Sequence, residues 1–415
     1  MPGGVTVTVG GDSLGDLPER VESISISRGR TDELDRTGTG SCTIALNWRG
    51  GSIVDYTGAA GSVTLSNPFG GSATVFSGTV DEMEYELDPT QAVTRVNVTL
   101  VDCLEFFAGI EMAPGLNGIV PLPAVVDDGN IFYEQELVGP LGSELEGRIG
   151  RLVLESGYSG PWEIFSGNVQ VKDTVYSPRT TILSAIQDAA DAEFPGVANV
   201  FVQQDGTFTF HGRLARFNPA NVQYDIDTYT AGDGAACVGD SARARIHRLA
   251  LNGSRQRIIN AALATPEGIL DADIEAQIVT DTASINDYGV RSWSAENLLT
   301  WYDELNDLTA NAAVKQFASY YVANYAQPQI RISELTFATR APEWDNAEAT
   351  WNVLCNADIS DIVTLSVANP GIALVDVDYF IEGVRMEISP LGDRGYALVK
   401  KTLDLSPRAY WTDGF

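Results

Sequence analysis

The sequence has few of the residues on which most enzymes and metal sites depend. Its 415 residues include only two histidines, His211 and His247, and only four cysteines. The cysteines are far apart, with no C-x-x-C pair and no histidine at a metal-ligand spacing: Cys42, Cys103, Cys237 and Cys355. We therefore expect no metal centre and no cofactor, and we interpret the cysteines as small apolar core residues.

Basic residues are also scarce. Lys and Arg total 26 against 56 Asp and Glu, which gives a formal charge of -30. The summed field repels phosphate backbones and anionic membranes, so specific nucleic-acid binding is not expected. A purely solubilising role for this acidity is an equally good interpretation.

Long apolar runs are missing as well. No stretch of about 18 apolar residues occurs, and no charged segment precedes an apolar one at the N-terminus. We therefore expect synthesis in a cytoplasm and no membrane insertion. With 44% hydrophobic and 20% charged residues, the chain has the composition of an ordered globular protein, and its length is typical of about three domains.

The most informative segment is Thr74 to Phe107, which predicts two long strands around an Asp88-Pro89 turn. Because strand side chains alternate with period two, one face of the first strand is acidic and the other is apolar. The acidic face carries Glu82, Glu84, Glu86 and Asp88, and the apolar face carries Met83, Tyr85 and Leu87. We expect a hairpin with one buried face.

Further alternating segments predict strands in both the N-terminal and the C-terminal parts of the chain. They are Val5 to Val9, Val21 to Ser27, Cys42 to Leu46, Ser62 to Ser66, Arg245 to Leu251, Arg257 to Ala264, Ile330 to Ala338, Asp361 to Val367, Asp378 to Ile388 and Ala397 to Leu405.

The middle of the chain predicts an α+β unit. Ser177-Pro178 favours a helix start ahead of Ile182 and Ile186, and Pro195-Gly196 ends that helix. Asp205-Gly206 then predicts a two-residue type I′ hairpin turn. That turn would place three phenylalanines on one buried face: Phe201, Phe208 and Phe210.

Two other segments are less regular. Gly109 to Gly147 is rich in Gly, Pro and acids, and predicts a connecting region with little regular structure. Trp301, Leu305, Leu308 and Ala312 follow helical spacing, which predicts a helical stretch from about Ser294 to Tyr325 with a break near Asn306 to Thr309.

Several short motifs, in this order, resemble those of minor tail or baseplate hub (tail tip) proteins of long-tailed bacteriophages. The motifs are Ile26 to Arg30, Phe76-x-Gly78-x-Val80, Val96-x-Val98, Asp102-x-Leu104, the Asp205 to Phe210 hairpin, Ile258 to Asn260, Tyr288-Gly289-x-Arg291, Asp361 to Leu365, Tyr379 to Val384 and Thr402 to Pro407. All of them consist of strand and turn residues, so they indicate a fold and name no chemistry.

The resemblance implies a mainly β chain with an α+β insert, in a multi-domain, tail-hub-like architecture with two tube-type β-barrel or sandwich domains. Residues 1–110 would form the N-terminal tube-like domain. Residues 111–244 would form the connecting region and insert, and residues 245–415 a C-terminal β-rich domain with the long helical stretch.

The strongest candidate for a catalytic motif is Gly11-Asp12-Ser13-Leu14-Gly15. It matches both G-x-S-x-G and the opening block of a GDSL-type esterase. A nucleophile elbow leads into a helix and needs a histidine base. Here Pro18 and a strand pattern follow, and neither histidine has the Asp three residues ahead that the esterase pattern requires. We interpret the segment as a turn between strands and expect no catalytic residue.

The remaining polar candidates carry no recognised chemistry. His211 ends one predicted strand and His247 lies inside another, so we interpret both as ordinary half-buried or surface residues. The acidic clusters at Asp127-Asp128 and at Asp271 with Asp273 lack calcium-loop spacing and are interpreted as solvated loops.

The function implied by the resemblance is structural and not enzymatic. The chain would form a homotrimeric ring at the virion tail tip that caps the tail tube, contacts a tube or distal tail protein and other tip proteins, and lines the DNA exit channel. Glu82, Glu84, Glu86 and Asp88 would face this lumen, where genomic DNA passes without specific binding. An acidic solvent face that discourages edge-to-edge pairing is an equal alternative.

A second class of function stays open, namely a β-sandwich module that binds a receptor or carbohydrate. Such a module needs a platform of exposed aromatic side chains. The tryptophans are scattered along the chain: Trp48, Trp162, Trp293, Trp301, Trp344, Trp351 and Trp411.

Overall fold

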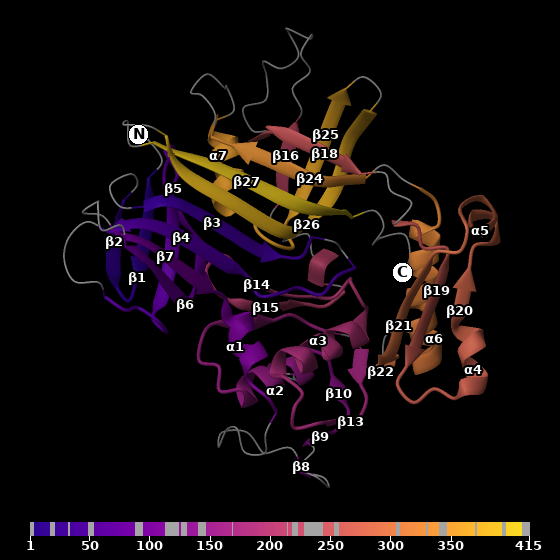
Figure 1. The fold of residues 1–415 in the computed structure, drawn as a ribbon. Coiled ribbons are helices and arrows are strands. Elements are labelled where there is room, and N and C mark those ends of the chain that lie inside the picture. The colour runs from indigo at the N-terminus through magenta and orange to yellow at the C-terminus, as the bar shows by residue number, and fades with distance from the viewer. Residues whose placement is uncertain are drawn as a thin grey trace.

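The fold of residues 1–415 was obtained as a computed structural model, shown in Figure 1. The structure describes residues 4–16, 21–31, 34–48, 54–87, 94–112, 124–125, 131–139, 147–167, 169–213, 215–217, 223–227, 244–252, 257–303, 308–328, 331–339, 347–369, 372–391 and 396–408.

The N-terminal part is a set of antiparallel strands with an alternating burial pattern. They are β1 (Val5–Val9), β2 (Asp12–Asp16), β3 (Val21–Gly29), β4 (Ser41–Trp48), β5 (Ala60–Ser66), β6 (Ser72–Leu87) and β7 (Thr94–Val101). β1 and β2 are joined by Gly10 and Gly11, which both have positive φ angles, 61° and 87°. Two consecutive positive φ angles are typical of a type I′ turn.

The C-terminal part continues the same sheet. Its strands are β16 (Gln223–Asp227), β17 (Ala244–Arg245), β18 (Arg248–Asn252), β24 (Arg331–Ala338), β25 (Ile362–Asn369), β26 (Ile372–Leu391) and β27 (Tyr396–Pro407). β26 pairs with β3 from Ile388 opposite Ile24 to Gly383 opposite Gly29. The result is one 14-stranded sheet among the described residues, built from strands of both ends of the chain (Figure 1). The predicted mainly β fold is confirmed, and the division into three domains stays a prediction.

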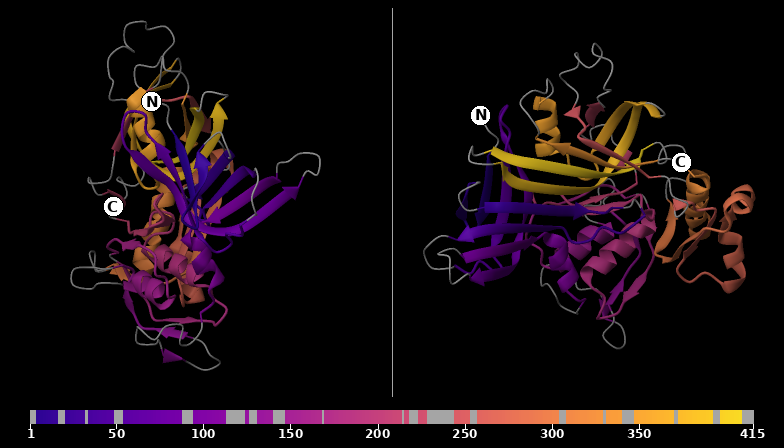
Figure 2. Two further views of the ribbon diagram at one scale, coloured as in Figure 1. Left: turned by 90° about the vertical axis from the view of Figure 1, so that its left-hand side faces the viewer. Right: turned by 45° about the horizontal axis from the view of Figure 1, so that its top comes forward.

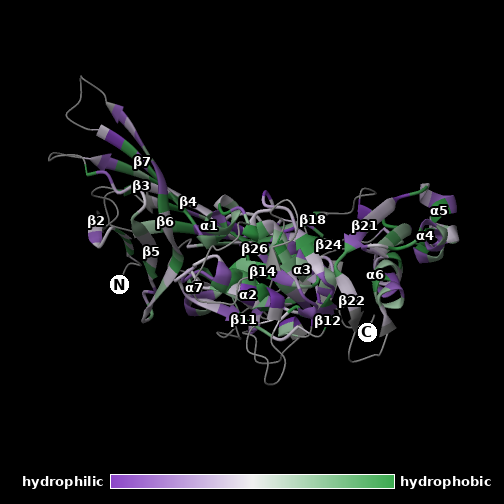
Figure 3. Cartoon of the chain, turned by 90° about the horizontal axis from the view of Figure 1, so that it is seen from below, coloured by the Kyte–Doolittle hydropathy of each residue, from purple (hydrophilic) through white to green (hydrophobic). Residues whose placement is uncertain are grey.

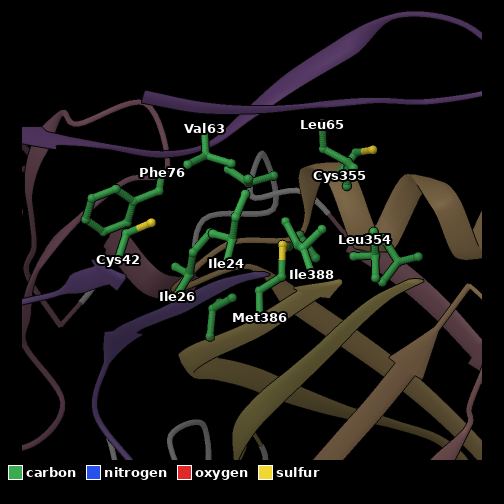
Figure 4. Packing of buried hydrophobic residues seen from close by; sticks show 14 of the residues in the cluster. Ile24, Ile26, Cys42, Val63, Leu65, Phe76, Leu354, Cys355, Met386 and Ile388 are labelled. Atoms are coloured by element: carbon green, nitrogen blue, oxygen red, sulfur yellow. The ribbon is translucent and has the colours of Figure 1, made fainter. Parts of the chain in front are cut away.

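The main core lies inside the curve of this sheet. Val63 and Leu65 of β5 lie across from Ile24 of β3 and from Met386 and Ile388 of β26, as Figure 4 shows. Helix α7 (Ala347–Asn356) adds Leu354 and Cys355 to the same cluster. Cys42 and Cys355 are buried here and Cys103 packs against a second core, in line with the interpretation of the cysteines; Cys237 lies outside the described residues.

The insert has its own core. Its helices are α1 (Cys103–Gly109), α2 (Gly147–Glu155) and α3 (Ile182–Glu193), with the 3-10 helix η2 (Ala215–Phe217). Its strands are β8 (Ala124–Val125), β9 (Ile131–Tyr133), β10 (Glu136–Leu137), β11 (Trp162–Ile164), β12 (Val169–Val171), β13 (Thr174–Tyr176), β14 (Asn199–Val202) and β15 (Phe208–His211). The region predicted to have little regular structure thus contains three short strands, and α2 and α7 were not predicted. The second strand, predicted to reach Phe107, ends at Val101, because Asp102 is the N-cap of helix α1.

The helix in the insert is where it was predicted, but it starts later. Thr181, not Ser177, is its N-cap, and its hydroxyl accepts a hydrogen bond from the amide of Ser184. Ile182 and Ile186 are buried, and the helix ends at Glu193 just before Pro195-Gly196. An N-cap hydroxyl pairs with a free amide of the first turn, which Thr181 does here.

The β14–β15 hairpin was predicted with the wrong turn. Gly206 donates to the carbonyl of Gln203, and Gly206 is the one residue of the turn with a positive φ, 94°. A type I′ turn requires two such residues, so the loop is longer by one residue and the register slips. Phe201 therefore lies opposite Thr209 and joins the main core, whereas Phe208 and Phe210 join the insert core.

The predicted long helix is also only half correct. Its first part forms β21 (Ser292–Leu298) and β22 (Thr300–Asp303), and helix α6 covers Ala310–Tyr325 after the two-residue strand β23 (Leu308–Thr309). Trp301 lies on strand β22 and is 48% exposed. The helical spacing from Trp301 to Ala312 is therefore accidental, because its first residue belongs to a strand. α6 packs on a three-stranded sheet of β20 (Ile278–Thr280), β19 (Ala261–Pro266) and β21, beside α4 (Asp271–Gln277) and α5 (Thr282–Tyr288).

The molecule is elongated, with two projections at opposite ends. The β6–β7 hairpin extends from one end, and the module of α4, α5, α6 and their sheet forms the other (Figures 2 and 3). None of the described helices is long and apolar enough to cross a bilayer.

The seam between β3 and β26 requires a glycine, which generates a first prediction. Gly29 has a φ of 83°, and a Cβ there would lie 2.4 Å from the carbonyl oxygen of Glu382. We expect Gly29→Ala to lower the free energy of unfolding by about 3 kcal/mol, from left-handed backbone strain plus this clash. Urea unfolding followed by circular dichroism measures the change.

Gly58→Ala is the matched control, because Gly58 has a φ of 80° and a Cβ there would meet nothing within 4 Å. Its cost should be the backbone strain alone, about 1 kcal/mol. Equal losses in the two variants would show that the seam tolerates a side chain at Gly29.

Candidate functional site

The acidic face predicted on β6 exists and is exposed. Glu82, Glu84 and Glu86 are all exposed, and they pair with Thr99, Asn97 and Arg95 of β7. On the other face Met83 packs against the main core. Asp88 lies outside the described residues. The strand therefore separates carboxylates from the core as the alternation predicted, with Tyr85 still 40% exposed near its end.

The same carboxylates lie along a free edge of the sheet. β5 pairs with β6 only from Ser72 to Thr79. Beyond that point β7 is the single ladder partner of β6 among the described residues. Charged side chains on such an edge discourage pairing with another strand.

A buried ion cluster holds the seam where the N-terminal and C-terminal strands meet. Arg30 Nε donates to Glu382 Oε2 (2.9 Å) and Arg216 Nη2 donates to Glu382 Oε1 (2.7 Å). The Ser406 hydroxyl donates to the same Oε1. All four side chains are nearly inaccessible to water, so each charge needs its partners.

The cluster also determines the protonation of its members. Burial alone would raise the pKa of Glu382, but Arg216 and Arg30, with the hydrogen bonds, lower it to about 2. Burial lowers the pKa of Arg216, whose guanidinium also lies 4.6 Å from the centre of the Phe380 ring. Glu382 is therefore ionised at any physiological pH.

The two arginines extend the cluster to the insert. Arg30 Nη2 donates to the carbonyl of Gly196 (2.7 Å), and Arg216 Nη1 donates to that of Val197 (3.3 Å). Gly196 and Val197 lie in the turn that follows α3. One carboxylate thus connects β3, β26, β27 and the insert.

A third buried arginine connects the β14–β15 hairpin to the sheet. Arg28 donates to the Val202 carbonyl (2.9 Å) and to Asp358 Oδ1 (2.8 Å), and the Gln204 amide donates to Asp358 Oδ2 (2.6 Å). Nearby, the buried Lys401 ammonium donates to three carbonyls at the C-terminal end of α7, where a cation is favourable. Burial lowers the pKa of Lys401 to about 8.

None of the described residues supports the esterase interpretation. The segment interpreted as a turn is mostly a strand, because only Gly10 and Gly11 form the turn and Asp12–Asp16 form β2. Ser13 is exposed on β2, opposite Thr8. A nucleophile elbow is a strand-to-helix turn, so the match to G-x-S-x-G has no structural counterpart here.

The two histidines lie in different surroundings. His211 is buried at the end of β15 between the rings of Phe165 and Phe201. Burial, and secondarily Arg216, lowers the pKa of His211 to about 3, so it stays neutral. His247 was predicted inside a strand, but it is exposed in a bend between β17 and β18.

The acidic clusters and tryptophans form no binding centre in the described part of the chain. Asp271 and Asp273 lie in the first turn of α4 and not in a loop, and Asp127-Asp128 lies outside the described residues. No group of three metal-ligating side chains occurs in the ranges described. Trp48, Trp162, Trp293 and Trp351 are partly buried in separate places, whereas Trp301 is exposed; Trp344 and Trp411 are not described.

Arg30, Arg216 and Glu382 form a unit that the sequence did not predict. Glu382 does carry a signal, because it interrupts the apolar run Tyr379 to Val384. A charge inside a buried strand needs a buried partner. Its partners lie 352 and 166 residues away, and no local pattern identifies them.

The fold matches solved structures of phage tail proteins. A tail protein from Neisseria meningitidis MC58 aligns over 100% of this chain and 99% of its own, with a TM-score of 0.60 and 12% identity. The 43 kDa tail protein of prophage MuSo2 from Shewanella oneidensis aligns over 98% and 99%, with a TM-score of 0.55 and 11% identity. No family model matches the sequence, and neither does any curated protein. The chain therefore has the fold of these tail proteins, as the motifs predicted.

Replacing the carboxylate at the centre of the ion cluster should be costly. Glu382→Gln keeps the shape of the side chain but leaves two buried guanidinium groups without a counter-charge. We expect a loss of about 3–5 kcal/mol in the free energy of unfolding, measured by urea unfolding. Glu387→Gln is the control, because Glu387 lies on the same strand in an exposed pair with Lys400 and should cost under about 1 kcal/mol.

The pH dependence of the same variant gives a second readout. The pKa of Glu382 is about 2 in the folded chain against its ordinary 4.5, so its contribution is fully present above pH 4.5 and is lost as the pH falls toward 2. The difference in the free energy of unfolding between wild type and Glu382→Gln should therefore become smaller as the pH falls from 4.5 toward 2. A gap that stays constant from pH 5 to pH 2.5 would contradict the assignment of the charge to Glu382.

Proposed function

We propose that the protein is a structural component of a phage tail, where three copies form a hub ring at the tip. The ring caps the tail tube, contacts a tube or distal tail protein on one side and other tip proteins on the other, and leaves a channel for DNA. The chain catalyses no reaction in this role. The fold shared with two phage tail proteins supports a place in the tail.

The observation that carries the proposal is a polar row across the joined sheet. Through the β3–β26 seam, one register row runs over five strands and ends on the acidic hairpin: Glu387, Ser25, Thr43, Thr99 and Glu82. The neighbouring row, Ile388, Ile24, Ile44, Val98 and Met83, faces the core. Arg385 and Lys400 also lie on this polar face, each paired with a carboxylate. A broad sheet with one polar face and one core face is suited to the wall of a tube.

The chemistry of this face fits a passage for DNA. Carboxylates repel phosphate, and serine and threonine hydroxyls carry no positive charge that would hold it. The face of the hairpin is dominated by acids, with Arg95 opposite Glu86. A polyanion would move along such a surface without binding to it.

Edges of the sheet support closure between copies. Among the described strands, β2, β17 and β18 each pair on one side only. Unpaired edges are satisfied when another chain completes the sheet, and closed rings are the usual symmetric solution. The number three comes from the resemblance to tail hubs, in which each chain supplies two tube-type domains to a sixfold tube.

Reversing the acidic face tests the channel. Glu82→Lys, Glu84→Lys and Glu86→Lys together keep the strand edge charged, and lysine protects an edge as well as glutamate does. Only the attraction for phosphate changes. We expect particles carrying the triple variant to assemble, but to eject DNA at least about tenfold more slowly, since cations in the channel hold the backbone.

Asp271→Lys, Asp273→Lys and Glu275→Lys form the matched control, with the same change of charge on the exposed helix α4. These particles should eject at the normal rate. Normal ejection by the β6 variant would leave edge protection as the role of the glutamates. In that case neutral Glu→Thr substitutions at the same three positions should cause aggregation.

The copy number is tested separately by a reconstruction of the assembled tail tip. We expect three copies around the tail axis, with β6 and β7 turned toward the lumen. Six copies, one copy, or a position away from the axis would reject the hub.

A further inference from the structure

A polar cavity lies where the insert, the segment before β4 and the α6 module meet. Its volume is about 290 Å³, close to the lower limit of roughly 300 Å³ for ligand pockets. One wall consists of residues 293–298, which form almost all of β21. The opposite walls come from α3, from residues 34–37 and from the turn that follows α3.

The β21 wall presents a free strand edge. Among the described residues β21 pairs only with β19, on one side and in parallel. The Arg291 carbonyl accepts from the amides of Asn260 and Ala261 and so points toward β19. In a parallel pair, alternate residues direct their amide and carbonyl toward the same neighbouring strand, so Trp293 also faces β19. The amide and carbonyl of Ser294 therefore point away from β19, and no described residue hydrogen-bonds to them.

A buried side chain on the opposite wall also lacks a partner. Asn199 is 1% exposed and lines the cavity. The Thr37 hydroxyl donates to Asn199 Oδ1 (3.1 Å), but Asn199 Nδ2 has no acceptor within the described part of the chain. Flipping the amide only exchanges which of the two atoms is unsatisfied. A buried amide in this state is costly, unless a ligand supplies the missing group.

The charges around the cavity favour a basic occupant. Arg36 is paired with Asp188 (2.8 Å) and Asp191 (2.6 Å), and Arg30 is engaged by Glu382. The carboxylates of Asp35 and Glu296 also line the cavity, and no ion pair with a described residue neutralises them. The lining is therefore net negative.

We propose that this cavity receives an extended basic segment of another protein, which adds as a strand to the free edge of β21. Main-chain hydrogen bonds to Ser294 would hold the segment, and its lysine or arginine side chains would pair with Glu296 and Asp35. A carbonyl of the segment would accept from Asn199 Nδ2 once the side chains that cover this atom move aside. The inference does not depend on the proposed ring.

The probe is an acetylated, amidated heptapeptide of alternating lysine and valine, whose binding to the full chain is measured by fluorescence anisotropy. We expect saturable binding, with protection of the Ser294 amide from hydrogen exchange. Glu296→Lys should weaken binding by about tenfold, because an attraction to the basic peptide is replaced by a repulsion at the strand edge. Glu275→Lys, which makes the same charge change on α4 of the same module, should leave binding within about twofold.

A second peptide with alternate backbone amides methylated keeps the charge but removes the donors needed for strand addition. It should not bind. Equal weakening by Glu296→Lys and Glu275→Lys, or equal binding of the methylated peptide, would show non-specific attraction to an acidic protein and overturn the proposal. Absence of binding by the unmodified peptide would overturn it as well.

Discussion

The arrangement of the whole chain depends on one buried carboxylate. Glu382 lies between Arg30 and Arg216 at the point where β3 meets β26, and both arginines continue to the carbonyls that follow α3. A buried ion pair of this kind adds little net stability compared with apolar packing, but removing one partner leaves an uncompensated charge. The cluster therefore specifies which strands and which turn must meet. The strands of both ends of the 415-residue chain meet beside it in one sheet.

The joined sheet then has two distinct sides. Apolar residues of β3, β4, β7 and β26 face β5 and α7 across the main core, and the hydroxyl and carboxylate row lies on the other side. Neither the N-terminal nor the C-terminal strands alone would form a surface of this width. The acidic hairpin extends it beyond the body of the molecule (Figure 3). The proposed role as part of a wall therefore rests on the fold more than on any single residue.

The insert is attached through a hairpin with a core on each side. Phe201 contributes to the main core, whereas Phe208 and Phe210 contribute to the insert core. Arg28 donates to the carbonyl of Val202, the last residue of β14, and Asp358 accepts from the amide of Gln204 in the turn. Because side chains on a strand alternate, a hairpin buried on both faces can join two cores without any linker. The cavity beside β21 lies next to this junction, where three parts of the chain meet but do not fill the space.

The sequence by itself determined the strands whose alternation is strict, the two faces of β6, the helix at Ile182 and the absence of a metal or catalytic pattern. These properties follow from local periodicity, which each segment carries independently of its neighbours. The tertiary structure alone decided the turn of the β14–β15 hairpin, the division of residues 292–325 into strands and a helix, and the partners of Glu382. Each of these depends on contacts between residues far apart in the chain: Phe201 has a second core available, β22 has β12 as a partner, and Arg30 lies 352 residues before Glu382. Such contacts leave no periodic trace in the sequence, because the energy that selects them arises only when the separate segments meet.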